Sequence, residues 1–395
     1  MKVSFNRDVL ISAITPAAGI ASIKNIASNI EGVLLECPGE IEGTCRVTAY
    51  DMENGMRTSI PCEIEEGGKI VVKTQSLLQI IRALPEGMID ISVDENYRAV
   101  ISQGKASFEI SVMPGENFPQ LPLLAGDRNY TMPQHVLRDV VTRTIYAVAV
   151  NDQRAVFNGA YFKIENNRLM IIGCDGNRIA ISHVQLPGEE NPDASVIVPG
   201  RLLGEVLRMI RDTEEDMTVT LARKHIIFTI GEYVYFTRLI EGEYIDYNRI
   251  LPKAHGTEVF VATDLLRGAL ERATLVTEDK LGGNTKPLIK LEFEGNLLKM
   301  SSVSAGGSIY DEIPVAKTGN DLTIGFNCRL LVEALRNVPD GADQLRLCLN
   351  TPLMGVTIEE AGGSGTKEYI TGAGAADDEF KDVFLDYIMP IRMNK

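Results

Sequence analysis

The sequence predicts an α+β protein in which one domain occurs three times in tandem, with helices covering one face of antiparallel sheets. Two segments with helical spacing of apolar residues each recur twice further along the chain, and β-rich stretches follow every copy. The copies are offset by about 125–130 residues, which is an ordinary length for one domain. The 395 residues are enough for three domains that each bury a core.

The first recurring segment begins at Arg7, at Gln134 and at Thr263, and every copy has the apolar spacing of a helix. Its first copy is also similar to the apolar region of a secretory signal peptide, because basic residues precede the apolar run. Asp8 stands next to that run, and the pattern recurs in the body of the chain, so we expect three equivalent helices and no signal peptide.

The second recurring segment begins at Thr74, at Pro199 and at Asn327. A short β-like run precedes each copy ("GKIVVK", "ASVIVP", "DLTIGF"), and alternating strands follow it ("MIDISVD", "MTVTLAR", "LRLCLN"). The order of strand, helix and strands therefore occurs twice in every copy, which predicts a further internal duplication. A unit of this length is much longer than a solenoid repeat, so we do not expect a linear stack.

The predicted domain boundaries fall at two polar junctions that contain Pro or Gly. These junctions are "LLAGDRNY", from Leu123, and "LPKAHGTE", from Leu251. They divide the chain into a first copy at 1–125, a second copy at 128–252 and a third copy at 253–395.

The charges are distributed unevenly between loops and helices. The net charge is −15, and the acidic surplus lies largely in loops and strand ends such as "EIEEGG", "LPGEENPD" and "GAADDEFKD". Every predicted helix carries arginine: Arg7, Arg82, Arg138, Arg143, Arg201, Arg208, Arg211, Arg267, Arg272, Arg329 and Arg336. Two interpretations stay open. These helix faces are simply solvated, or they form one weakly basic surface that binds phosphates without reading sequence.

No motif in the sequence predicts catalysis. The four histidines lie outside recognisable motifs, and there is no nucleophile elbow and no zinc-protease helix motif. Asp175 and Arg178 could be imagined as a catalytic pair, but Asp-Gly between two apolar runs is first a hairpin turn signal. The "GGSGTK" stretch at 362–367 lacks the order of a phosphate loop and predicts a flexible surface loop. We therefore expect no enzyme activity and no cofactor.

The six cysteines are scattered, without the spacing of a zinc site. They are Cys37, Cys45, Cys62, Cys174, Cys328 and Cys348. Free thiols in a reducing cytosol are the expectation, with no bound metal. No run is long enough for a transmembrane helix, and we expect a cytoplasmic protein.

The chain ends on "YIMPIRM", an apolar run that only Arg392 interrupts. Such an ending packs into a core, frays, or forms the lip of a groove that another protein fills. The residues by themselves leave these three alternatives open.

Four features together carry a family resemblance: the three copies, "CDGNRIAI" from Cys174, "GEYIDYNRILP" from Gly242, and the ending "YIMPIRM". Over its whole length the chain resembles the bacterial sliding clamps, the beta subunit of DNA polymerase III. The resemblance implies a non-catalytic processivity factor of the polymerase III holoenzyme. It also implies a head-to-tail homodimer that closes into a ring of DNA-clamp domains around duplex DNA, with helices lining the hole.

The resemblance also implies residues that contact DNA and residues that form the dimer seam. The implied DNA contacts, which would work as a diffuse field, are Lys24, Arg82, Arg138, Arg143 and Arg201. The implied seam places Phe108 and Ile110 of the first copy against Leu275 and Val276 of the third copy.

A groove between the second and third copies is the last implication. Short linear peptides of the polymerase III alpha subunit, the clamp loader, other DNA polymerases and repair proteins would dock there. The implied groove residues are Phe157, Cys174, Gly176, Asn177, Arg178, Ile179, Ile245, Arg249, Ile250, Asn327, Leu330, Leu353, Gly355, Ile388, Met389, Pro390, Ile391, Arg392 and Met393. Arg178 and Arg392 would fix the peptide backbone or a polar side chain.

The sequence departs from the family pattern at several groove positions. Cys174 stands where Thr is common, Ile245 where Pro is common, and Leu330 where an aromatic residue occurs. Asn394 and Lys395 run past the usual end, and the stretch 361–386 is longer than the usual hairpin. Two other hypotheses remain: an interaction scaffold that no longer serves DNA, and an enzyme with an unrecognised site between copies.

Overall fold

The computed structural model describes residues 1–21, 32–39, 43–126, 128–188, 191–277, 287–304, 307–362 and 383–393. These residues fall into two compact units. Unit 1 consists of Met1–Arg138 and Arg201–Leu239, and unit 2 consists of Asp139–Gly200 and Ile240–Lys395.

Unit 1 contains a five-stranded sheet and a nine-stranded sheet, and all recorded strand pairs are antiparallel. The five-stranded sheet has the order β5-β1-β7-β8-β9, and the nine-stranded sheet has the order β10-β6-β2-β3-β4-β18-β17-β16-β11. The strands are β1 Lys2–Asn6, β2 Gly32–Cys37, β3 Thr44–Tyr50, β4 Asn54–Pro61, β5 Glu63–Glu66, β6 Gly68–Lys73, β7 Met88–Val93, β8 Arg98–Gln103, β9 Ala106–Ser111, β10 Met113–Pro114, β11 Arg128–Pro133, β16 Asp216–Leu221, β17 His225–Ile230 and β18 Tyr233–Arg238.

Unit 2 repeats this plan with a nine-stranded and a four-stranded sheet. Their orders are β15-β12-β13-β14-β27-β26-β25-β19-β23 and β22-β21-β20-β24. The strands are β12 Gly159–Glu165, β13 Arg168–Cys174, β14 Arg178–Gln185, β15 Ala194–Pro199, β19 Thr257–Ala262, β20 Leu288–Glu294, β21 Leu297–Ser304, β22 Gly307–Pro314, β23 Ala316–Gly319, β24 Leu322–Asn327, β25 Gln344–Leu349, β26 Val356–Glu360 and β27 Val383–Ile388.

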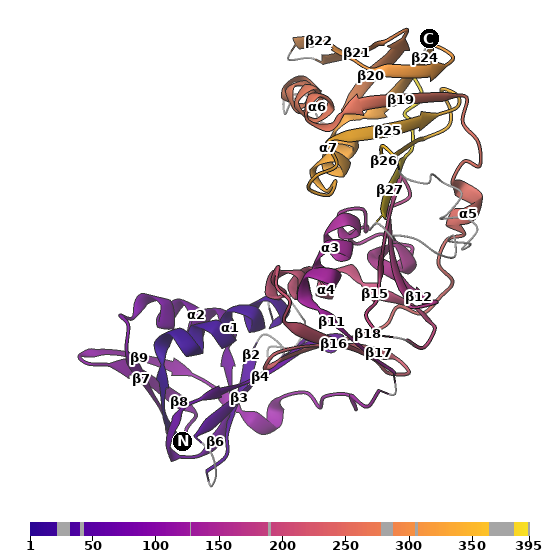
Figure 1. Ribbon diagram of the computed structural model, residues 1–395. Helices are drawn as coiled ribbons and strands as arrows, with labels where there is room; N and C mark the ends of the chain where they lie inside the picture. The colour runs from indigo at the N-terminus through magenta and orange to yellow at the C-terminus, as the bar shows by residue number, and fades with distance from the viewer. Residues whose placement is uncertain are drawn as a thin grey trace. The chain divides into compact units, whose positions relative to one another are not determined.

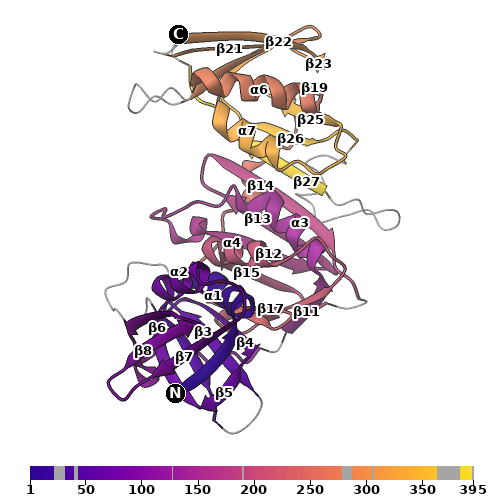
Figure 2. The same cartoon turned by 90° about the vertical axis from the view of Figure 1, so that its left-hand side faces the viewer.

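All six expected helices are present, so the fold prediction is confirmed. The first recurring segment forms α1 Arg7–Ala21, α3 Gln134–Ile145 and α6 Thr263–Thr277, and the second forms α2 Thr74–Ala83, α4 Gly200–Met209 and α7 Cys328–Arg336. Short helical turns add η2 Gly115–Asn117, η3 Ala155–Asn158 and α5 Tyr247–Ile250. Helices α1 and α2 pack side by side in unit 1 (Figure 1), as α6 and α7 do in unit 2 (Figure 2).

Sheets continue across the expected copy boundaries. Strand β4 of the first copy pairs with β18 of the second copy, and β14 of the second copy pairs with β27 of the third copy. Each compact unit contains one of these shared sheets. The chain therefore passes from one unit to the other inside α3, after Arg138, and at the start of α4, after Gly200. The copy boundaries at 125–128 and 252–253 stay a prediction.

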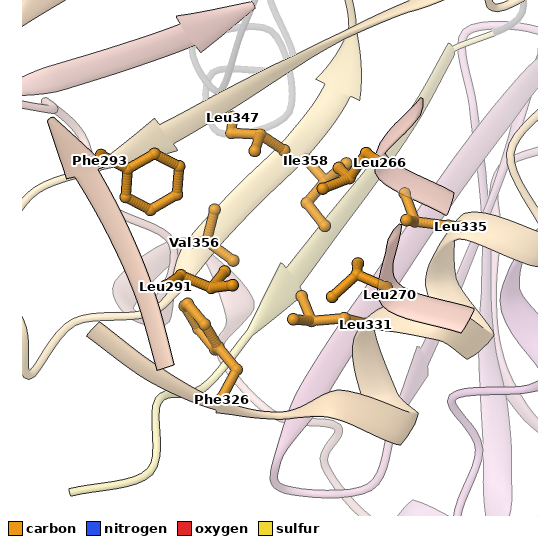
Figure 3. A pocket seen from close by; sticks show the side chains of 10 residues that line it. All are labelled: Leu266, Leu270, Leu291, Phe293, Phe326, Leu331, Leu335, Leu347, Val356 and Ile358. Atoms are coloured by element: carbon orange, nitrogen blue, oxygen red, sulfur yellow. The ribbon is translucent and has the colours of Figure 1, made fainter. Parts of the chain in front are cut away.

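The core of the third copy contains a small apolar space between α6, α7 and the strands around them. Figure 3 shows the ten side chains that line it, which leave about 10 Å³ between them. They are Leu266, Leu270, Leu291, Phe293, Phe326, Leu331, Leu335, Leu347, Val356 and Ile358. None of the ten is polar, so the space is a packing gap and offers no hydrogen bonds to water.

Among the residues that the structure describes, no helix is both long and apolar enough to cross a bilayer.

Candidate functional site

The C-terminal segment divides into a buried part and a surface part. In β27, Tyr387 pairs with Ile179 on one side and Thr357 on the other, and its ring is buried. Ile388 is fully buried at 0% exposure. Beyond β27, Met389 is 41% exposed, and Arg392 is exposed as well. Tyr387 and Ile388 therefore pack into the core, whereas Met389 and Arg392 after them are exposed at the surface.

Two backbone hydrogen bonds hold the segment from Met389 to Met393, which we call the terminal lip. The Met389 amide donates to the carbonyl of Asn177 over 2.8 Å, and the Ile391 amide donates to the carbonyl of Gly325 over 2.8 Å. The terminal lip thus runs from the β13–β14 turn of the second copy to β24 of the third copy. A Cβ at Gly325 would lie 2.8 Å from Met393 Cγ, so that glycine lets the lip pack closely.

The β13–β14 turn has the geometry that its Asp-Gly sequence predicts. Gly176 has a φ of +88°, which favours glycine. The Asp175 carboxylate accepts from the amides of Asn177 and Arg178, over 2.8 and 3.1 Å. The hairpin prediction is confirmed, and Asp175 serves the turn.

An apolar cluster lies beside this turn and brings together several expected groove residues. Phe157, Cys174 and Ile179 belong to it, and Ile245 packs against it. The other buried members are Ile172, Ile181, Tyr247, Leu251, Leu385 and Tyr387. Burial raises the pKa of the Cys174 thiol to about 11, so this side chain stays neutral and contributes an apolar surface.

Three of the expected groove residues in unit 2 have exposed apolar side chains. Ile250 is 41% exposed, Leu353 is 64% exposed and Met389 is 41% exposed. Arg249, next to Ile250, has a side chain that is 87% exposed and pairs with Asp246 over 2.9 Å. We call the cluster, the terminal lip and these exposed residues the terminal groove, after the groove that the family resemblance implies.

Arg178 is an expected groove residue, but its contacts lie within the chain. It is 8% exposed and its guanidinium contacts Asp175 at 3.0 Å, Glu333 of α7 at 2.6 Å and the carbonyl of Tyr146 at 2.6 Å. It also lies 4.9 Å from the centre of the Tyr146 ring. Arg178 therefore ties the β13–β14 turn of the second copy to α7 of the third copy.

Other expected groove residues also have structural contacts. The Asn327 side chain accepts from the Arg329 amide and caps α7. Leu330 is partly buried against the core of the third copy. At Gly355, an added Cβ would lie 2.5 Å from the carbonyl oxygen of Ile388 and 2.6 Å from the Tyr387 ring. Lys24, Asn394 and Lys395, and most of the stretch 361–386, lie outside the described residues.

Sequence reasoning missed Tyr146, Arg154 and Asp386. The Tyr146 hydroxyl donates to Asp386 over 2.5 Å, which joins the end of α3 to β27. Burial raises the pKa of Asp386 to about 7. The Arg154 guanidinium lies 4.0 Å over the Phe157 ring. No motif marks these three residues, and the contact between Tyr146 and Asp386 joins chain segments that are 240 positions apart in the sequence.

The expected DNA-facing arginines all have partners within the chain. Arg82 donates to Thr15 over 3.2 Å. Arg138 lies 3.8 Å from Asp212, and Arg143 lies 3.7 Å from Asp139. Arg201 makes a 2.8 Å ion pair with Asp51, which is buried. The positive charge of these helices is thus partly balanced by nearby carboxylates.

The expected dimer-seam residues lie on exposed elements. Strand β9 is an edge strand, exposed along most of its length, and Phe108 is 38% exposed. Ile110 is partly exposed on the same strand. Leu275, near the end of α6, is 83% exposed, and Val276 beside it is partly exposed. An exposed edge strand with apolar side chains is a surface that readily pairs with another chain.

One group of metal-ligating atoms occurs among the described residues. It consists of His255, Glu258 and Cys348, whose ligand atoms lie within 4.8 Å of one another. The guanidinium of Arg346 lies 3.2 Å from Glu258 and 3.4 Å from Glu359. Arg346 already supplies positive charge there, so this group is better described as an ion-pair network than as a metal site.

Comparison with known proteins identifies the family. Models of the DNA polymerase III beta subunit match along the chain: the N-terminal domain at 1–122, the central domain at 131–246 and the C-terminal domain at 248–371. A beta sliding clamp from Pseudomonas putida is 28% identical over 365 residues, which covers 92% of this chain and 96% of that protein.

Solved structures agree with these matches. A DNA polymerase III beta subunit from Eubacterium rectale superposes with a TM-score of 0.87 at 26% identity, covering 100% of both chains. A sliding clamp from Pseudomonas aeruginosa, solved bound to griselimycin, superposes with a TM-score of 0.84 at 25% identity, again over 100% of both chains. This chain therefore belongs to the DNA polymerase III beta subunit family, the bacterial sliding clamps.

Proposed function

We propose that this chain, a DNA sliding clamp by its family, tethers partner proteins by binding their short linear peptides in the terminal groove. The observation that carries this proposal is the division of the C-terminal segment. Buried Tyr387 and Ile388 anchor it, while Met389 stays 41% exposed beside an apolar cluster. An anchored segment with an exposed apolar side chain is pre-organised to receive a ligand.

The chemistry of the terminal groove suits several different partners. Met389 and Met393 are flexible and polarisable, so they adapt to side chains of different shape. Leu353 and Ile250 add exposed apolar surface. Since Arg178 is engaged within the chain, Arg392 is the better choice for a polar contact with the peptide. The solved Pseudomonas aeruginosa clamp bound to griselimycin shows that a family member accepts a ligand.

The expected affinity is modest. Burying one Leu and one Phe of a partner contributes roughly 1.5–3 kcal/mol each. After the cost of ordering the peptide, this agrees with micromolar binding, about −8 kcal/mol. Weak binding of this kind lets several partners exchange on one clamp.

The proposal includes a ring around DNA. Two chains would join head to tail, with Phe108 and Ile110 on β9 of one chain facing Leu275 and Val276 on α6 of the other. Arginines of the helices, including Arg82, Arg138, Arg143 and Arg201, would face the phosphates together with Lys24. Because carboxylates lie near several of them, contact with DNA would be weak, independent of sequence and sensitive to salt. No catalytic step is assigned to the chain.

Peptide titration tests the groove. A fluorescent peptide of the Gln-Leu-x-Leu-Phe type is titrated with the full chain and followed by anisotropy. We expect micromolar binding, and at least a tenfold loss for Met389→Asp, because a charge at this exposed apolar position opposes burial of the peptide.

The matched control is Leu123→Asp, which places the same charge on an 86% exposed leucine of unit 1. It should bind like the unchanged chain. Equal affinity for the unchanged chain and Met389→Asp would contradict the terminal groove as the binding site.

A further inference from the structure

The terminal lip is held by two different copies of the domain. Its Met389 amide donates to the carbonyl of Asn177 in the β13–β14 turn, and its Ile391 amide donates to the carbonyl of Gly325 on β24. Strand β24 ends at Asn327, and α7 begins at the next residue. The position of the terminal lip therefore depends on how the turn of the second copy lies against β24 and α7 of the third copy.

One carboxylate on α7 contacts that turn. Glu333 accepts from Arg178 over 2.6 Å through one oxygen, and from Arg329 over 2.7 Å through the other. Arg329 lies four residues earlier on α7, so its contact holds the Glu333 side chain in place on the helix. Burial raises the pKa of Glu333, but the two arginines lower it more, so the pKa lies below its ordinary value and the carboxylate stays charged.

Arg178 connects this carboxylate to the turn. Its Nε donates to the Asp175 carboxylate over 3.0 Å. The other oxygen of Asp175 accepts from the amides of Asn177 and Arg178, over 2.8 and 3.1 Å. The carbonyl of Asn177, which holds Met389, thus belongs to a turn that is fixed by buried Arg178 and, through it, by Glu333 of α7.

Unit 1 contains the same arrangement with the charges exchanged. Strands β3, β4 and β18 follow one another in its sheet as β13, β14 and β27 do in unit 2. The Arg238 amide, at the end of β18, donates to the carbonyl of Glu53 in the β3–β4 turn over 3.2 Å. Asp51 of that turn lies 2.8 Å from Arg201 on α4. In both units, therefore, an ion pair joins the turn to the second recurring helix of the next copy.

We propose that Glu333 is a positioning residue for peptide binding. Through Arg178 it holds the β13–β14 turn, and with it the terminal lip, in the arrangement that receives a partner peptide. Without this contact, Met389 would become ordered only when the peptide binds, and the cost of that ordering lowers the affinity. This inference rests on the proposed function of the terminal groove and deepens it.

Hydrogen–deuterium exchange tests the positioning without any peptide. Glu333→Ala removes the carboxylate, and alanine favours the helix, so α7 should remain folded. In the full chain, the Met389 amide should exchange at least about fivefold faster in this variant, because its acceptor is held less firmly. Mass spectrometry with fragmentation to single residues measures the rate. Glu333→Gln, which keeps the size of the side chain and removes its charge, is a second variant with the same expected direction.

The matched control is Glu271→Ala on α6. The Glu271 carboxylate lies 3.3 Å from Arg336, so this variant also removes an ion pair of α7, but one with no part in the β13–β14 turn. It should leave the exchange rate of the Met389 amide unchanged.

Peptide titration then tests the consequence for binding. Glu333→Ala should bind a fluorescent Gln-Leu-x-Leu-Phe peptide at least about fivefold more weakly than the unchanged chain, and Glu271→Ala should bind equally well. In a chain that already carries Arg178→Met, adding Glu333→Ala should weaken binding no further, because Glu333 acts through Arg178. A general loss of stability would instead add to the effect of Arg178→Met. Melting curves show that each variant is folded.

The outcomes distinguish this inference from the proposed function. If the unchanged chain does not bind the peptide, the proposed function is wrong and the inference fails with it. If the unchanged chain binds, equal affinity for Glu333→Ala, or additive losses in the double variant, would overturn the positioning role and leave the terminal groove standing. Unaltered exchange of the Met389 amide in Glu333→Ala would overturn that role as well.

Discussion

At the scale of single residues, Asp386 is the group with the clearest physical consequence. It is 4% exposed in β27 and accepts a hydrogen bond from Tyr146. Burial raises its pKa from 3.8 to about 7, because the charged form loses its water, although the hydrogen bond from Tyr146 and the charge of Arg178 oppose this change. The carboxyl is therefore close to half protonated near neutral pH.

This pKa predicts a pH dependence of stability. Between pH 3.8 and about 7 the folded chain holds a proton on Asp386 that the unfolded chain lacks. The proton on Asp386 thus stabilises the folded chain fully below pH 3.8, and this stabilisation is lost as the pH rises to about 7. Melting temperatures measured at pH 5 and pH 8 should differ less for Asp386→Asn than for the unchanged chain.

The control for this prediction is Asp264→Asn on α6, because the Asp264 side chain is 95% exposed. It should keep the pH dependence of the unchanged chain. If the melting temperature of Asp386→Asn changed with pH as much as that of the unchanged chain, the pKa of Asp386 would not differ between the folded and unfolded states.

Residues also show where sequence patterns stop being informative. Asp175 and Gly176 predict a turn because the signal is local, and the structure has that turn. The contact of Arg178 with Glu333 joins residues 155 positions apart, and nothing in either neighbourhood indicates it. The family resemblance implies that Arg178 meets a peptide, and the contacts that the structure gives it are with Asp175, Glu333 and Tyr146.

At the scale of elements, the helices were predictable and the sheet order was not. Each helix carries its own apolar spacing, so α2 buries Leu77, Leu78 and Ile81 as the pattern requires. The position of β27 between β14 and β26 depends on pairing with distant strands. Alternating polarity indicates a strand but does not identify the strands that pair with it. The contacts that β27 makes at the candidate site could therefore not be predicted from the sequence.

The placement of β27 predicts the effect of a change at Gly355, just before β26. A Cβ there would collide with the backbone of Ile388 and the Tyr387 ring. Gly355→Ala should destabilise unit 2 by about 1–3 kcal/mol, the usual cost of overpacking. Chemical denaturation followed by circular dichroism measures this cost.

Gly204→Ala is the matched control, because Gly204 lies in α4 and an added Cβ there meets no heavy atom within 4 Å. Alanine favours the helix, so this variant should be neutral or more stable by up to about 1 kcal/mol. If Gly355→Ala were as stable as Gly204→Ala, the close approach of Gly355 to β27 would be wrong.

At the scale of the whole molecule, the proposed ring depends on apolar residues that a single chain leaves exposed. Leu275 is 83% exposed on α6, and Phe108 is 38% exposed on β9. Leu275→Asp should raise the dimer dissociation constant at least tenfold, because a buried charge would lack a partner at the seam. Sedimentation velocity over a range of concentrations measures the effect.

Val150→Asp serves as the control, since Val150 is also highly exposed, at 86%, and has no part in the proposed seam. Its dimer dissociation constant should equal that of the unchanged chain. A monomeric unchanged chain at micromolar concentration, or a Leu275→Asp chain that dimerises normally, would count against the proposed seam.

Site-specific crosslinking locates the bound peptide on the chain and so tests the proposal that partner peptides bind at the terminal groove. A Gln-Leu-x-Leu-Phe peptide with a photoreactive group at its Phe position would be irradiated with the full chain and mapped by mass spectrometry. We expect crosslinks at Met389, Leu353 or Ile250, and we expect excess unlabelled peptide to suppress them. Crosslinks confined to other surfaces and equally suppressed by competitor would contradict this proposal.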